Sequence, residues 1–354
     1  MASTAIEASS LDWAQKRLDE LWARGRHFLG TRYAILCGAM SWVSERHLVA
    51  AISNAGGFGV IATGSMSPDL LRAEIKATFA LTDKPFGVNV IVMHPELDAL
   101  IGVCIEEGVG HVVLAGGLPP RGALDRLKQA GVKVLAFAPT LPVARKLARQ
   151  GVDAFIIEGM EAGGHIGPVA TGVLAQEILP HLREVPVFVG GGIGRGDAIA
   201  LYLGMGAAGC QLGTRFVCAT ESIAHPRFKQ AIIRASARDA QPSIQLDPEF
   251  PVIPVRALAN RATERFVEAQ RETIARYRAG ELSQKEAQLA IEHFWAGALR
   301  RAVIEGDVEN GSLMAGQSVG MVTAEQSTQA IIDELVGQAV NAIAETAIGA
   351  AGRA

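Results

Sequence analysis

The segment Glu158-Gly-Met-Glu-Ala-Gly-Gly-His165 decides the fold of this chain together with two later segments, Gly190-Gly-Gly-Ile-Gly194 and Gly213-Thr-Arg-Phe216. Each of the three directly follows a short apolar run that is typical of a buried strand. Because neighbouring parallel strands end at the same edge of a sheet, we expect the three glycine-rich segments to lie together.

The glycines in these segments predict a site for a phosphate-bearing ligand. A residue without a Cβ lets the backbone approach the ligand closely, and N–H groups at the start of a following helix attract an anion. His165 stands at the same edge of the predicted sheet. It is one of eight histidines in the chain, and its position at the carboxyl end of a strand predicts a catalytic rather than a structural role.

Eight apolar runs alternate with helical patterns along the first two thirds of the chain. The expected strands are residues 34–37, 58–62, 86–92, 111–115, 133–138, 154–157, 186–189 and 209–212. Parallel strands that are covered on both faces are almost wholly apolar, and eight of them predict a closed (β/α)8 TIM barrel. The alternative is an open doubly wound sheet with a dinucleotide site. However, residues 190–196 do not fit G-x-G-x-x-G, and they follow the seventh strand rather than the first.

The chain is expected to have four parts. These are an N-terminal helical lead-in (residues 1–30), the barrel core (31–222), a smaller helical lid or substrate region with a return loop (223–320), and a C-terminal helix (321–354). A proline-rich linker, residues 241–254, lies within the third part, and two long amphipathic helices are expected after it, from about residue 257 to residue 300. The glycine-rich segment 307–317 is expected to return to the mouth of the barrel.

Composition excludes several classes of protein. The 354 residues are 49% hydrophobic and 19% charged, with a formal net charge of −3 and no basic patch interleaved with aromatic residues, so nucleic acid is not an expected partner. No run of about 18 apolar residues is present, so no membrane association is expected. Four widely spaced cysteines without a C-x-x-C pair predict reduced thiols and a cytoplasmic location. The sequence carries no typical metal-ligand motif. A homodimer is compatible with the sequence, which does not fix the oligomeric state.

Taken together, the motifs resemble the nitronate monooxygenase (2-nitropropane dioxygenase) family, which also contains the flavin-dependent enoyl-acyl-carrier-protein reductases. Besides the three segments above, the resemblance rests on Tyr33-Ala-Ile-Leu-Cys-Gly-Ala-Met-Ser-Trp-Val43, Ser53-Asn-Ala-Gly-Gly-Phe-Gly59, Asp83-Lys-Pro-Phe-Gly-Val-Asn89 and residues 306–317. These motifs occur in order over nearly the whole chain after Gly30.

The resemblance implies a TIM barrel that holds non-covalent FMN. Gly38, Ala39 and Met40 would pass beneath the flavin ring, Asn89 would hydrogen-bond to the flavin, Gly163 and Gly164 would flank the ribityl chain, and Gly191, Gly192, Gly213 and Thr214 would hold the phosphate. In family members of this type, the histidine that matches His165 is the base or polarising group over the flavin. The reference pKa of histidine, near 6.5, suits either role.

The roles of six other residues remain open from the sequence. Glu158 and Glu161 either orient the imidazole, bind a cation or have structural roles, and Cys37 is favoured as a small buried residue. Arg256 and its neighbours Arg261 and Arg265 pair with a dinucleotide phosphate or face water.

Two classes of function follow, an FMN-dependent oxidoreductase and a barrel that only binds a phosphorylated ligand. His165 favours the enzyme. Its leading reaction is the oxidation of alkyl nitronates by O₂ to a carbonyl compound and nitrite. The alternative enzyme reaction is reduction of an enoyl thioester, for which NADH or NADPH would first reduce the flavin.

Overall fold

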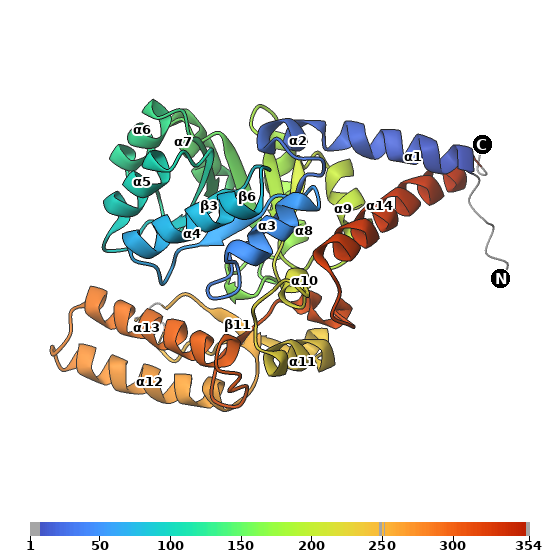
Figure 1. Ribbon diagram of the computed structural model, residues 1–354. Helices are drawn as coiled ribbons and strands as arrows, with labels where there is room; N and C mark the ends of the chain where they lie inside the picture. The colour runs from blue at the N-terminus through green and yellow to red at the C-terminus, as the bar shows by residue number, and fades with distance from the viewer. Residues whose placement is uncertain (1–7, 248–249, 251, 352–354) are drawn as a thin grey trace.

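A barrel of eight parallel strands forms the centre of the molecule (Figure 1). The computed structural model describes residues 8–247, 250 and 252–351. The barrel strands are β1 (Ile35–Cys37), β2 (Val60–Ala62), β3 (Gly87–Ile91), β4 (His111–Ala115), β5 (Lys133–Phe137), β6 (Ala154–Glu158), β8 (Val187–Gly190) and β9 (Gly209–Leu212). All eight coincide with the predicted strands to within a few residues, so the predicted TIM barrel is confirmed.

Hydrogen bonds between the first two strands complete the closure of the barrel. The paired order runs β1-β9-β8-β6-β5-β4-β3-β2, and Leu36 bridges to Phe58 just before β2. The Cys37 N–H donates to the Phe58 carbonyl at 2.9 Å, and the Phe58 N–H donates to the Ile35 carbonyl at 2.8 Å. No edge strand is therefore left open in the barrel.

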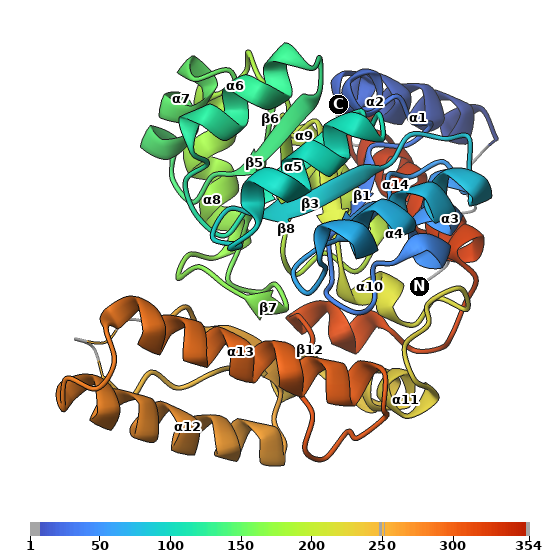
Figure 2. The same ribbon diagram turned by 60° about the vertical axis from the view of Figure 1, so that its left-hand side comes forward.

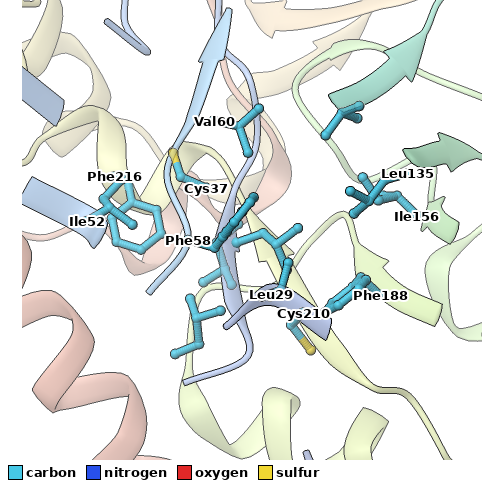
Figure 3. Packing of buried hydrophobic residues seen from close by; sticks show 14 of the residues in the cluster. Leu29, Cys37, Ile52, Phe58, Val60, Leu135, Ile156, Phe188, Cys210 and Phe216 are labelled. Carbon is cyan, nitrogen blue, oxygen red and sulfur yellow. The ribbon is translucent and has the colours of Figure 1, made fainter. Parts of the chain in front are cut away.

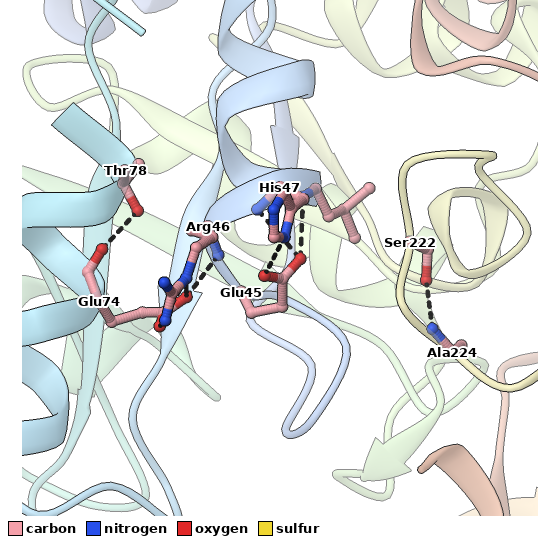
Figure 4. Close-up of polar contacts among 8 residues, drawn as sticks. Glu45, Arg46, His47, Glu74, Thr78, Ser222 and Ala224 are labelled. Carbon is pink, nitrogen blue, oxygen red and sulfur yellow. Dashed lines mark hydrogen bonds and ion pairs between the residues drawn. The ribbon is translucent and has the colours of Figure 1, made fainter. Parts of the chain in front are cut away.

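Helices surround the strands, as the alternating pattern predicts. They are α3 (Arg46–Asn54), α4 (Pro68–Leu81), α5 (Leu97–Glu106), α6 (Arg121–Gln129), α7 (Leu141–Arg149), α8 (Thr171–Ile178), α9 (Gly196–Gly204) and the short α10 (Thr214–Val217). Local contacts fix their starts and their spacing. The Glu45 carboxylate caps α3 by accepting from the His47 N–H at 3.0 Å, and Arg46 forms an ion pair with the buried Glu74 of α4 at 2.6 Å (Figure 4).

Side chains fill the interior of the barrel, as Figure 3 shows around Phe58, Leu135, Ile156 and Phe188. The helix α2 (Ala23–Leu29) closes the amino-terminal end of the barrel. Its Phe28 ring lies 5.4 Å from the His111 ring and 6.2 Å from the Phe188 ring. Burial lowers the pKa of His111 to about 4, so this histidine is a neutral core residue that bonds to the Phe28 carbonyl.

A two-helix unit with its own small core lies beside the mouth of the barrel (Figures 1 and 2). It contains α12 (Arg261–Arg278) and α13 (Gln284–Val303), and we refer to residues 240–314 as the lid. Phe266 of α12 stacks on Trp295 of α13 with ring centroids 4.2 Å apart. Before the lid, α11 (Pro226–Arg234) follows the last barrel strand.

A four-stranded sheet that the sequence analysis did not predict joins the lid to the segment after β6. Its strands are β10 (Ala240–Pro242), β11 (Val255–Leu258), β12 (Leu313–Met314) and β7 (Gly164–His165). The expected helix start at residue 257 is wrong, because that residue lies in β11. The helix begins only at Arg261, where the Asn260 side chain caps it by accepting from the Ala262 N–H at 3.0 Å.

The first and last helices pack on each other and extend together from the barrel (Figure 1). They are α1 (Ala8–Leu21) and α14 (Thr328–Ala351), and α14 also crosses α9. At the crossing, a Cβ on Gly196 would lie 1.9 Å from the Leu335 carbonyl oxygen, so only glycine allows this approach. None of the helices in the described ranges has the length and apolarity needed to cross a membrane. The predicted parts at residues 1–7 and 352–354 lie outside the described residues.

Candidate active site

The three glycine-rich segments lie side by side at the carboxyl ends of β6, β8 and β9. Glu158 pairs with Gly190 in the register of β6 and β8, and Gly190 pairs with Gln211 in the register of β8 and β9. The Gly159 N–H donates to the Gly190 carbonyl at 3.1 Å. The convergence that the sequence predicts is therefore present in the fold.

The loop after β8 has the geometry of an anion cradle. Gly191 and Gly192 adopt φ values of +97° and +71°, which side chains rarely tolerate. In the described part of the chain, the N–H groups of Gly192 and Ile193 have no protein acceptor. Gly213 and Thr214 open α10 next to this loop, and the first N–H groups of a helix are not used within it. These residues fit a phosphate group, because they offer unused donors and no intruding Cβ.

The segment after β1 crosses the mouth of the barrel beside the cradle. Gly38, Ala39 and Met40 are half-buried, and the Met40 sulfur lies 3.6 Å from where a Cβ on Gly213 would be. Trp42 follows at φ +66°, and its indole N–H is buried without a partner among the described residues. The side chain packs under Arg300 of α13, with the guanidinium carbon 5.7 Å from the ring centroid.

Asn89 occupies the interior of the barrel opposite the cradle. It is 8% exposed. Because Asn89 lies two residues after Gly87, both positions face the same side of β3, and a Cβ on Gly87 would contact the interior Phe58 ring at 3.0 Å. Its side-chain amide donates to the Val113 carbonyl at a long 3.3 Å. The side-chain oxygen therefore remains available to a ligand at the mouth.

His165 lies on the lid side of the mouth, in the short strand β7. Figure 2 shows β7 between the barrel and the lid. The strand pairs with β11, where Val255 is opposite His165, and the Ile166 N–H donates to the Pro254 carbonyl at 2.9 Å. His165 is exposed, so its imidazole can reach a ligand and exchange protons with water. The sequence analysis had no signal for the strand β7, which holds the histidine.

The return loop contacts the same segment, as the sequence predicts. A Cβ on Gly163 would lie 2.6 Å from the backbone of Ala315 and Gly316. The Gly316 N–H donates to the Thr214 hydroxyl at 2.9 Å, and the Gln317 N–H donates to the Glu161 carbonyl at 2.9 Å. Gly163, Thr214 and the return loop therefore form one continuous wall of the site.

The two glutamates that flank this segment have different surroundings. Glu161 accepts from the Thr171 N–H and hydroxyl, both at 2.9 Å, so it caps α8. Glu158 accepts from the Gln211 amide at 3.0 Å. Burial raises the pKa of Glu158 to about 7, against the lowering effects of that hydrogen bond and of His165. Gln211 was missed by the sequence analysis, although a polar residue within an apolar strand was a usable signal.

Arg256 and Cys37, whose roles the sequence left open, are both buried. Arg256 is 3% exposed and donates to the carbonyls of Met160 and Ala240, so it joins the His165 segment to the lid sheet. It therefore does not face water, whereas Arg261 and Arg265 are exposed. Burial raises the pKa of the Cys37 thiol to about 12, which supports a structural role for this cysteine.

Comparisons with known proteins agree with this architecture. The family model described as nitronate monooxygenase matches residues 24–338. A dehydrogenase from Mycobacterium tuberculosis, named for a (3aS,4S,5R,7aS)-5-hydroxy-7a-methyl-1-oxo-octahydro-1H-indene-4-carboxyl-CoA substrate, is 30% identical over 88% of this chain and 94% of its own length.

Two further relatives represent the named branches. A nitronate monooxygenase from Paraburkholderia phytofirmans is 33% identical over 59% of this chain and 70% of its own length. The structure of FabK from Thermotoga maritima is 37% identical, with a TM-score of 0.81 over 94% of this chain and 99% of that chain. The chain, with its closed barrel and glycine-rich mouth, therefore belongs to the nitronate monooxygenase family of oxidoreductase enzymes.

Proposed function

We propose that the protein is an FMN-dependent oxidoreductase whose reaction takes place at the mouth of the barrel. The observation that carries the proposal is the anion cradle of Gly191, Gly192, Gly213 and Thr214 beside an exposed histidine. FMN supplies a ring that accepts an electron pair from one substrate and passes it to another. Gly38, Ala39, Met40 and Asn89 would contact that ring, and Gly163 and Gly164 would flank the ribityl chain.

His165 is the residue that we assign to proton transfer. Its exposed imidazole can take the α-proton from a neutral nitroalkane, and the pairing of β7 with β11 keeps the ring near the mouth. The Glu158 carboxylate lies close enough for the two charges to influence each other. An ionised carboxylate there would offset the positive charge that the ring gains on taking the proton.

Oxidation of alkyl nitronates is the first candidate reaction. It is supported by the family description and by the nitronate monooxygenase relatives. Electrons come from the nitronate itself in this reaction, so the chain needs no site for a nicotinamide nucleotide.

Reduction of an enoyl thioester is the second candidate. FabK belongs to the enoyl-acyl-carrier-protein reductases, and its similarity to this chain covers the lid as well as the barrel. The dehydrogenase from M. tuberculosis is also named for a thioester substrate. NADH or NADPH would supply the electrons in this case.

The source of electrons distinguishes the two reactions. We expect 2-propylnitronate to bleach the bound FMN anaerobically and faster than NADH or NADPH does, measured by stopped-flow absorbance with each donor separately. Rapid bleaching by a nicotinamide nucleotide, together with consumption of crotonyl-CoA and no nitrite from nitroalkanes, would favour the second candidate. A colourless protein that gains no flavin signal from added FMN would contradict both.

A further inference from the structure

A polar pair crosses the interior of the barrel just below its mouth. Glu158, Gly190 and Gln211 occupy one row across β6, β8 and β9. Because Gly190 has no side chain, Glu158 reaches across it, and its Oε2 accepts from Gln211 Nε2 at 3.0 Å. A Cβ on Gly190 would lie 3.4 Å from the Gln211 side chain.

The row points into the barrel and not toward the outer helices. Phe188 precedes Gly190 by two residues, so both face the same side of the strand, and Phe188 packs against the Phe28 ring that plugs the barrel. Gln211 is 7% exposed and also lies 3.4 Å from where a Cβ on Gly38 would be. The pair is thus directly beneath the segment after β1 that we assign to the flavin ring.

Few charges act on this pair. Among the described residues, the charged group that affects Glu158 is His165 of β7. Apart from Gln211 itself, the neighbouring strands β1, β5, β8 and β9 carry at their carboxyl ends only the buried Cys37 and Cys210 thiols or apolar side chains. Burial raises the pKa of both thiols. The charged Lys133 of β5 lies at the far end, where it donates to the Phe28 carbonyl. Burial, which raises the pKa of Glu158 to about 7, therefore leaves this carboxyl able to change its protonation state near neutral pH.

We infer that Glu158 takes up a proton from water whenever the bound flavin is reduced. The inference rests on the proposed FMN dependence. A hydride equivalent, which is an electron pair and one proton, leaves the flavin with a net negative charge. A second negative charge on the carboxylate beneath it would be repelled, so a second proton moves from solvent to Glu158. The electron pair comes from the reducing substrate, and no bond within the chain breaks.

Gln211 suits this role because its side chain can serve both forms of the carboxyl group. Its amide nitrogen donates to the ionised carboxylate, as the structure shows. After a turn of the amide, its carbonyl oxygen can accept from the protonated carboxyl. The partly buried pair therefore keeps a hydrogen bond in both states, which limits the cost of moving the proton.

The number of protons taken up per electron pair tests the inference. It is obtained from the dependence of the FMN midpoint potential on pH, measured by spectroelectrochemistry between about pH 7.5 and about pH 8.5. We expect two protons for the unchanged protein and one for Glu158→Gln. Glu161→Gln is the matched control and should keep two protons, because that carboxylate caps α8.

Three further variants test whether Glu158 is the group that takes up the second proton. His165→Asn should keep two protons, since the imidazole is not the group that takes up the second one. Gln211→Leu removes the donor that favours the ionised carboxylate, so Glu158 stays protonated before reduction and the count falls toward one. Glu158→Asp should keep two. A count of two in Glu158→Gln, or a fall to one in His165→Asn, would overturn the assignment to Glu158. Failure of the unchanged chain to bind FMN would overturn the proposed function as well.

Discussion

Replacing His165 with alanine is expected to lower turnover of a neutral nitroalkane by about 10²–10⁴-fold while FMN stays bound, which is the range for a positioned acid or base. The expectation follows from the placement of an exposed imidazole in β7, beside the cradle and within range of the Glu158 charge. FMN should remain because the residues assigned to its phosphate lie on the loops after β8 and β9. Steady-state oxygen consumption and the flavin absorbance of the purified variant check the two parts of this prediction.

A second histidine provides the control for this experiment. His293 of α13 is also exposed but lies on the lid helix, so His293→Ala should leave turnover unchanged. A preformed nitronate needs no deprotonation, and its oxidation should suffer much less from His165→Ala than that of the nitroalkane. Equal losses with both substrates would mean that His165 organises the site rather than transferring a proton.

The sequence was sufficient to predict the barrel because the barrel is built from local patterns. Each strand is an apolar run bounded by glycine or by a helical pattern, and β4 and β9 have the predicted bounds. The glycines at residues 190–194 and 213 can also be recognised in the sequence. The structure explains two of them, because the positive φ values at Gly191 and Gly192 favour glycine. The convergence of the segments then follows from the parallel arrangement of the strands.

The lid sheet could not be predicted for the opposite reason. Its strands have two to four residues and come from separate parts of the chain, so none of them shows an alternating pattern of its own. Arg256 illustrates the consequence. A basic residue before a charged helix is typical of an exposed face, yet pairing of β11 with β7 buries it against the Met160 and Ala240 carbonyls.

The Glu158–Gln211 pair shows a third situation, in which the sequence identified Glu158 as a candidate but not its partner. Glu158 and Gln211 are 53 residues apart and meet only because the strand between them carries Gly190 at the shared row. The spacing of residues along the chain does not indicate which of them share a row of the sheet, because this depends on the register of β6, β8 and β9. The environment that raises the pKa of Glu158 is likewise a property of the closed barrel.

Replacing Gly192 with valine is expected to weaken FMN binding by about 10²–10⁴-fold. The side chain would enter the anion cradle, and loss of two hydrogen bonds to a charged phosphate costs about 3–6 kcal/mol at about 1.5–3 kcal/mol each. The substitution also strains the backbone, because Gly192 has φ +71° and a Cβ there would lie 3.1 Å from Glu161 Cβ. Fluorescence titration of the apoprotein with FMN measures the change in affinity.

Gly131→Val separates loss of the cradle from backbone strain. Gly131 has φ +74°, almost the same as Gly192, but a Cβ there would meet nothing within 4 Å. It precedes β5, at the end of the barrel away from the mouth. Both variants should therefore show a similar fall in the thermal unfolding midpoint, since a left-handed conformation costs a residue with a Cβ about 1–2 kcal/mol. Only Gly192→Val should lose affinity for FMN. If both variants bound FMN as tightly as the unchanged chain, the phosphate would have to lie elsewhere on the barrel mouth, and the loop after β8 would be left with a structural role alone.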